Sequence, residues 1–162
     1  MNVEYIPFMN RFWIIFTIVL PAYLATKPCV AVAAADRYLV EGPVAAEVVS
    51  VLDGDTVVVE AKPWPQQTIS VSVRIRGIDA PELHSRCPEI RIRAMAARRA
   101  LASMLAAGGG RLSLSSISGD KYFGRVVADV ISTDGRDAAV TLLEAGLVLP
   151  YSGGRKLPEK CA

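Results

Sequence analysis

Two β-prone runs joined by a tight acidic turn constrain the fold of this chain more than any other feature. The first run is Val44 to Val51, and the second (TVVVE) is Thr56 to Glu60. The turn between them contains Asp53-Gly54-Asp55, and Asp-Gly between valine-rich runs is a strong β-hairpin signal. The folded part of the chain is therefore predicted to begin with two antiparallel strands.

A third strand is predicted after the break at Pro63-Trp64-Pro65, because apolar and polar side chains alternate between Gln67 and Ile78. The apolar positions are Ile69, Val71, Val73 and Ile75, and the polar ones are Ser70, Ser72, Arg74 and Arg76. This is the pattern of a half-buried strand with its arginines on the polar face. The first half of the domain is thus expected to be a three-stranded meander.

The next segment has helical spacing. Pro88 suits the first helical position and Glu89 the first turn. Apolar residues then recur at helical spacing until Gly108-Gly109-Gly110 ends the run. These residues are Ile90, Ala94, Ala97, Leu101 and Leu105.

Two more strands and a second helix complete the domain. The strands are Arg111 to Ile117 and Gly124 to Ser132, and Asp137 is the expected N-cap of a helix that ends near Gly146. The remaining tail is expected to be mostly irregular. Five strands with a helix between the third and fourth is the element order of an OB-type barrel. The predicted fold is mainly β with helices (α+β), a five-stranded OB-type barrel with helices packed against it.

An apolar segment precedes this domain. Arg11 is followed by the uncharged run Phe12 to Thr26, and small residues lead up to Asp36. This pattern predicts a signal peptide over residues 1–35, cleavage before Asp36, and export to the periplasm or the medium. The alternative is an uncleaved membrane anchor, which Lys27 disfavours.

Length and composition limit the number of domains and the classes of protein to which this chain can belong. The chain has 162 residues, a net charge of +2, one histidine and three cysteines. That length leaves residues 36–162 as one domain, and the charge argues against a polybasic binder held by bulk charge. One histidine and three cysteines exclude a zinc finger. No feature of the sequence argues against a monomer.

Two cysteines, Cys87 and Cys161, remain after the predicted leader. Export to an oxidising compartment favours a disulfide between them, which would tie the C-terminal tail to the middle of the chain. The alternative is a pair of free thiols far apart.

Acidic residues stand at the predicted strand ends: Asp53 with Asp55, and Asp79 with Glu82. If the sheet brings Asp55 and Asp79 together, they form a hard oxygen site for Ca²⁺ or Mg²⁺. A further carboxylate beside it can deprotonate a water, and nearby arginines can bind phosphate oxygens. This combination indicates phosphodiester hydrolysis rather than peptide or glycoside cleavage.

Three blocks of this sequence resemble the signature blocks of the staphylococcal nuclease (thermonuclease) family. They are VVSVLDGDTVVVE (Val48–Glu60), VRIRGIDAPEL (Val73–Leu83) and DKYFGRVVADV (Asp120–Val130). The resemblance runs from about Val44 to Tyr151, with the blocks in the family's order. It implies an OB-fold enzyme that uses Ca²⁺ to hydrolyse DNA and RNA with little sequence preference, leaving 3′-phosphate ends.

The resemblance also implies roles for residues of the first two blocks. Asp55 and Asp79 match the family's Ca²⁺-binding carboxylates. Ala80 stands where the family has a threonine that contributes its backbone carbonyl, and alanine has the same carbonyl. Glu82 matches the proposed general base, and Arg74, five residues before Asp79, matches the first catalytic arginine.

The third block supplies the second catalytic arginine, Arg125, and the candidate substrate-binding residues Lys121 and Tyr122. Phe123 is inserted before Gly124 relative to the family's Asp-Lys-Tyr-Gly-Arg, so the loop is one residue longer here. Tyr151 resembles a family tyrosine near the nucleotide base, or is a packing aromatic of the tail.

Two further residues receive no catalytic role. Arg76 is interpreted as a surface or salt-bridging residue, and His84, although close to Glu82, as a histidine without a ligand or catalytic function.

A second hypothesis is a non-catalytic OB-fold module that binds nucleic acid or protein. A third is a nuclease tethered to a membrane by an uncleaved leader. The expected partners are DNA and RNA, with no stable protein partner and a membrane only if the leader stays attached.

Overall fold

The computed structural model describes residues 39–154, 156 and 161. The predicted leader, residues 1–35, and the expected cleavage site before Asp36 lie outside this described part. Within it, no helix is both long enough and apolar enough to cross a membrane.

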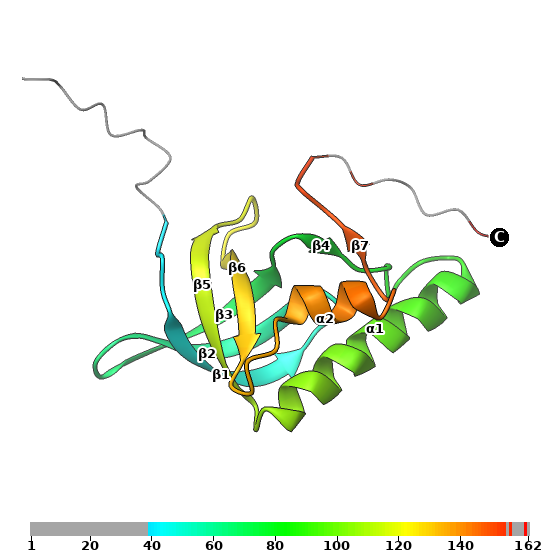
Figure 1. Cartoon of the computed structure of the whole chain (residues 1–162). Helices are drawn as coiled ribbons and strands as arrows, with labels where there is room; N and C mark the ends of the chain where they lie inside the picture. Colours follow the sequence, from blue (N-terminus) through cyan, green and yellow to red (C-terminus); the bar gives the residue numbers. More distant parts are fainter. Residues whose placement is uncertain (1–38, 155, 157–160, 162) are drawn as a thin grey trace, which may run out of the picture. The chain divides into compact units, whose positions relative to one another are not determined.

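Five strands close into a barrel, as the sequence predicts (Figure 1). Around the barrel the order is β1-β2-β3-β6-β5, and β5 pairs back onto β1. Neighbours are antiparallel except β3 and β6, which are parallel. The α+β fold of an OB-type barrel is therefore confirmed. The strands are β1 (Val44–Val51), β2 (Thr56–Trp64), β3 (Gln67–Ile75), β5 (Arg111–Gly119) and β6 (Arg125–Ser132).

Two helices, α1 (Pro88–Ala107) and α2 (Ala138–Glu144), lie beside each other along the barrel (Figure 1). Pro88 begins α1, and Asp137 caps α2 by accepting a hydrogen bond of 3.0 Å from the Val140 N–H. Both helix starts confirm the prediction. Every apolar position predicted to face the core from α1 is buried: Ile90, Ala94, Ala97, Leu101 and Leu105.

Branched aliphatic side chains fill the barrel, and full burial of each stabilises the fold by about 1.5–3 kcal/mol relative to exposure. Fully buried examples from the strands are Val57, Val59, Val73, Ile75, Leu114 and Val130. The alternation fails at Ile69, which is 48% exposed. The reason is that β2 continues to Trp64, so the end of the β2–β3 hairpin extends beyond the barrel (Figure 1).

The third strand also ends earlier than predicted. β3 stops at Ile75, and the chain turns at Gly77, which has a φ of +82° that L side chains rarely adopt. A short strand β4 (Ile78–Asp79) then pairs with β7 (Leu149–Pro150). The start of the C-terminal segment, predicted to be irregular, is thereby held next to Asp79.

Candidate functional site

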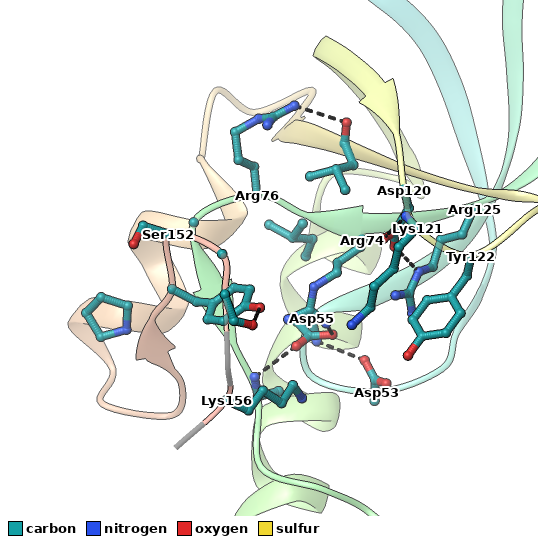
Figure 2. Close-up of a pocket in the computed structure, with 18 of the residues that line it drawn as sticks. Asp53, Asp55, Arg74, Arg76, Asp120, Lys121, Tyr122, Arg125, Ser152 and Lys156 are labelled. Carbon is teal, nitrogen blue, oxygen red and sulfur yellow. Dashed lines mark hydrogen bonds and ion pairs between the residues drawn. The ribbon is translucent and has the colours of Figure 1, made fainter. Parts of the chain in front are cut away.

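A cleft of about 1170 Å³ gathers most of the predicted site residues (Figure 2). They come from the β1–β2 turn, from β3 and the segment after β4, from the β5–β6 loop and from the chain after β7. Its charged and aromatic lining residues are Asp53, Asp55, Arg74, Arg76, Glu82, Asp120, Lys121, Tyr122, Arg125, Tyr151 and Lys156. Ala80 lines the cleft as well.

Asp55 lies at the floor of the cleft, and only 2% of it is exposed. Gly54 permits this position, because a Cβ there would lie 2.6 Å from the Ala97 Cβ of α1 and 2.9 Å from the Ala80 Cβ. The turn can therefore press against the helix only with glycine at residue 54. This close approach is a second reason for the Asp-Gly pair besides its turn chemistry.

The Asp55 carboxylate is held by short hydrogen bonds. Its Oδ2 accepts from the Ala80 N–H at 2.9 Å, and its Oδ1 accepts from the Thr56 hydroxyl at 2.8 Å. Burial and the neighbouring charge of Asp53 nevertheless raise the pKa of Asp55. A buried carboxylate in this position favours a cation beside it.

Arg74 is that cation, and it bridges two acids. Its Nη1 lies 2.9 Å from Asp55 Oδ1, and its Nη2 lies 2.8 Å from Asp79 Oδ1. Burial lowers the pKa of Arg74, but the charges of Asp55 and Asp79 outweigh it and raise the pKa above the ordinary value. The two carboxylates thus converge on one guanidinium group.

These residues fit a hard divalent cation, although they supply only part of its coordination. Ca²⁺ takes six to eight oxygen ligands, and the described residues contain no group of three or more His, Cys, Asp or Glu side chains that could hold a metal. Asp55, Asp79 and the Ala80 carbonyl are all hard oxygen donors. A metal here needs water and substrate oxygens to complete its shell, so it is expected to bind weakly without substrate.

Arg125 begins β6 and faces the same cleft (Figure 2). Its Nε forms a hydrogen-bonded ion pair with Asp120, and its guanidinium lies 4.7 Å from the centre of the Tyr122 ring. Lys121 Nζ lies 5.0 Å from the same ring. Tyr122 therefore lies against the second arginine, and Lys121 lies against Tyr122, despite the longer loop.

Glu82 stands at the rim, with its side chain 65% exposed, and Lys156 binds it. Lys156 Nζ lies 2.8 Å from Glu82 Oε1 and 2.8 Å from Asp79 Oδ1. Burial lowers the pKa of Lys156, but its hydrogen bonds to the two acids outweigh burial and raise the pKa above the ordinary value. The ammonium group therefore stays charged.

Tyr151 forms the wall opposite the β5–β6 loop. Its N–H donates to the Gly77 carbonyl at 2.9 Å, and its hydroxyl donates to the Gly154 carbonyl at 2.8 Å. The Arg74 guanidinium lies 5.5 Å from the centre of its ring. Tyr151 thus packs against a site residue and also faces the cleft, so both of its predicted roles remain compatible with its position.

Arg76 is a salt-bridging residue, as the sequence interpretation preferred, and no catalytic role was expected of His84. Arg76 forms an ion pair of 3.2 Å with Asp129 and donates to the Ser118 hydroxyl at 3.1 Å, away from the two acids (Figure 2). Arg76 does not share the orientation of Arg74, because β3 ends at Ile75, between the two arginines. His84 is exposed and lies outside the residues that line the cleft.

The two cysteines are free thiols in this structure, Cys87 buried and Cys161 exposed. They are not far apart, because a hydrogen bond with Cys87 is the main cause that raises the pKa of Cys161. Cys87 also donates to Glu89 Oε2 at 3.3 Å. The disulfide stays a prediction.

Sequence reasoning missed two members of the site. Asp120 lies within a quoted block, and its place five residues before Arg125 was the available signal. Lys156 had no signal, because it lies in a tail rich in glycine and proline that carries no recognisable motif. Only the β4–β7 pairing brings that tail to the acids.

The fold and the cleft define the class of this protein: an OB-type barrel with helices, in which three arginines, two lysines and four acids line one cleft. A scan against protein-family models finds no match, and a search of curated proteins finds no matching protein. Function is therefore inferred from the site itself.

Proposed function

We propose that this chain is an exported, Ca²⁺-dependent endonuclease that hydrolyses DNA and RNA with little sequence preference and leaves 3′-phosphate ends. One observation carries the proposal. A single guanidinium, that of Arg74, bonds both Asp55 and Asp79 at 2.9 and 2.8 Å, in a cleft that also presents Arg125 and Glu82. Convergent acids, arginines and a further carboxylate at the rim are the groups that phosphodiester hydrolysis requires.

Asp55, Asp79 and the Ala80 carbonyl would hold Ca²⁺, which when bound supplies positive charge beside the scissile phosphate and makes a bound water more acidic. The Thr56 hydroxyl and the Ala80 N–H hold the Asp55 carboxylate in place. The acid is therefore oriented before any ligand arrives, which lowers the cost of assembling the site.

Glu82 takes the proton of the attacking water. The water oxygen forms a bond to phosphorus, the bond from phosphorus to the 5′ oxygen breaks, and the leaving oxygen takes a proton from solvent. Arg74 and Arg125 donate to the phosphoryl oxygens as negative charge develops there, since planar guanidinium groups match phosphate oxygens in pairs. The phosphate stays on the 3′ side of the cleaved bond.

Lys121 and Tyr122 bind the nucleotide next to the scissile phosphate. Lysine contacts a phosphate without reading the base, and an aromatic ring stacks on any base. Neither contact involves the ribose 2′ position. Weak sequence preference and activity on both DNA and RNA follow from this chemistry.

The test compares DNA cleavage by the purified protein with Ca²⁺, with EDTA, and with the variant Glu82→Gln. Glu60→Gln is the matched control, because Glu60 is an exposed glutamate of β2 outside the cleft. Cleavage is expected only with Ca²⁺ and with an intact Glu82, and fragment ends should block polymerase extension until a phosphatase removes the 3′-phosphate. Equal cleavage in every tube rejects the mechanism.

A non-catalytic binding module is the second candidate. It is favoured by the absence of a three-acid metal cluster among the described residues and by the ion pairs that already neutralise Asp79. This candidate predicts that oligonucleotides bind at the cleft, that Arg125→Ala weakens this binding, and that no fragments form with Ca²⁺.

Export forms part of the proposal and has its own test. N-terminal sequencing of the protein recovered from the periplasm or medium should give Asp36 as the first residue. A membrane-bound product that begins at Met1 would instead support the anchor.

A further inference from the structure

Lys156 occupies the oxygens that the proposed nuclease needs. Its Nζ lies 2.8 Å from Asp79 Oδ1, a proposed cation ligand, and 2.8 Å from Glu82 Oε1, the proposed base. Asp79 Oδ1 is also the atom that binds Arg74 Nη2. Asp79 therefore forms ion pairs with two cationic side chains of this protein, and one of them, Lys156, lines the cleft (Figure 2).

The fold brings this lysine to the acids through a series of contacts along the tail. β7 pairs with β4, in register Asp79 to Leu149. Tyr151 continues the contact through its N–H bond to the Gly77 carbonyl, and its ring lies beside Arg74. The C-terminal segment thus runs along the mouth of the cleft before it reaches Lys156.

Lys156 thus follows closely on a segment that β7 attaches to the body of the domain. A lysine attached in this way is presented to the acids at a high effective concentration.

We propose, on the basis of the nuclease function proposed above, that Lys156 is a tethered cation that competes with the divalent metal for Asp79 and holds Glu82 away from the attacking water. Lys156 then restrains the site until metal and substrate displace it. A carboxylate oxygen that accepts a hydrogen bond from an ammonium group has that lone pair engaged, so the bound lysine fixes the position of Glu82 and occupies one of the sites with which Glu82 can take a proton from water.

The test is a calorimetric titration of CaCl₂ into the full chain, purified in a non-ionic detergent. Lys156→Gln removes the charge, Lys156→Arg keeps it, and Lys62→Gln is the matched control. Lys62 is a half-exposed lysine that pairs with Glu47 at 2.7 Å on the barrel, outside the cleft.

Lys156→Gln should bind Ca²⁺ about threefold to tenfold more tightly than the wild type, the range that one or two half-exposed ion pairs supply. Lys156→Arg and Lys62→Gln should match the wild type. Nuclease activity of Lys156→Gln should reach half its maximum at a correspondingly lower Ca²⁺ concentration.

If the wild-type protein binds Ca²⁺ and cleaves DNA but Lys156→Gln has an unchanged Ca²⁺ affinity, the tethered-cation role is overturned. The proposed nuclease function then still stands. Unchanged Ca²⁺ affinity with a raised KM for DNA overturns the tethered-cation role too, and assigns Lys156 to phosphate binding instead. If no variant binds Ca²⁺ or cleaves DNA, the nuclease function itself fails, and the role of Lys156 fails with it.

Discussion

Arg74 and Asp79 are five positions apart in the chain and form an ion pair of 2.8 Å. The pair exists because β3 ends at Ile75 and the chain reverses at Gly77, so that the side chain of Arg74 meets the carboxylate that starts the next segment. The same guanidinium reaches Asp55 at 2.9 Å. Arg74 is thus the residue that draws the two acids of the site together.

Replacing Arg74 with lysine should lower nuclease turnover by about a hundredfold to a thousandfold, the usual effect of losing a donor to the transition state. Lysine offers a single point charge and cannot present a planar fork to phosphate oxygens. Steady-state kinetics with Ca²⁺ measure the effect, and circular dichroism checks the fold. Arg136→Lys, which alters an exposed ion pair with Asp134, is the control. Similar losses in both variants would show that Arg74 has no special role.

Replacing Asp55 with asparagine should raise the thermal midpoint while it abolishes cleavage. Burial and the charge of Asp53 raise the pKa of Asp55 in the folded protein above its ordinary 3.8. Between the ordinary pKa and the raised pKa, the folded state therefore binds more protons than the unfolded state. Stability therefore falls as the pH rises through that window, and asparagine removes this loss. Calorimetry at pH 7 measures the shift, and a lowered midpoint contradicts the assignment.

Replacing Asp120 with asparagine should have the opposite effect on stability. Burial raises the pKa of Asp120, but hydrogen bonds from Arg125 and the Lys121 N–H outweigh it and lower the pKa below the ordinary 3.8. The stabilisation is present above 3.8 and is lost as the pH falls through the lowered value. Urea unfolding should show a deficit for Asp120→Asn at pH 7 that shrinks below the ordinary pKa. A deficit that does not change with pH would rule out the ion pair as its cause.

Replacing Gly54 with alanine should destabilise the protein by about 1–3 kcal/mol, the usual cost of overpacking, and weaken Ca²⁺ binding. The new Cβ would lie 2.6 Å from the Ala97 Cβ, so the turn that carries Asp55 must move away from α1. Gly119→Ala is the matched control, because nothing lies within 4 Å of a Cβ there. Denaturant unfolding and calorimetry measure both effects. Equal stability of the two variants would show that the turn has room to adjust.

Replacing Tyr122 with alanine should raise the KM for single-stranded DNA about tenfold, since one base–aromatic stack contributes about 1–3 kcal/mol. Tyr122→Phe should stay near wild type because it keeps the ring. Trp64→Ala is the control, as Trp64 is an exposed aromatic at the end of the β2–β3 hairpin, outside the cleft. A KM that rises equally in Tyr122→Ala and Trp64→Ala would indicate non-specific stacking. Initial rates over a range of oligonucleotide concentrations provide the measurement.

Most of the barrel could be predicted from local signals. Asp53-Gly54 marks the first turn, the alternation from Val71 to Ile75 marks β3, and Pro88 and Asp137 mark the two helix starts. Each of these signals comes from residues that are neighbours along the chain. The prediction is wrong where burial depends on distant parts of the sheet. Ile69 is exposed because the β2–β3 hairpin extends beyond the barrel.

The acids and arginines of the site were recognisable one at a time, from block resemblance and from residue chemistry. Which of them touch was not. Arg74 and Arg76 alternate identically in the sequence, yet only Arg74 binds Asp55 and Asp79, because the strand ends between the two arginines. Asp120 became part of the site only through its pairing with Arg125.

Local sequence patterns predict the five barrel strands, the two helices, their order and the kinds of charged group available to the site, because backbone preference and hydrophobic periodicity act over a few residues. The return of the tail to Asp79, and the position of Lys156 2.8 Å from both Asp79 and Glu82, depend on long-range contacts. The two-residue pairing of β4 with β7 has no periodicity of its own. Its stability comes from contacts between segments about seventy residues apart, which a local pattern does not contain.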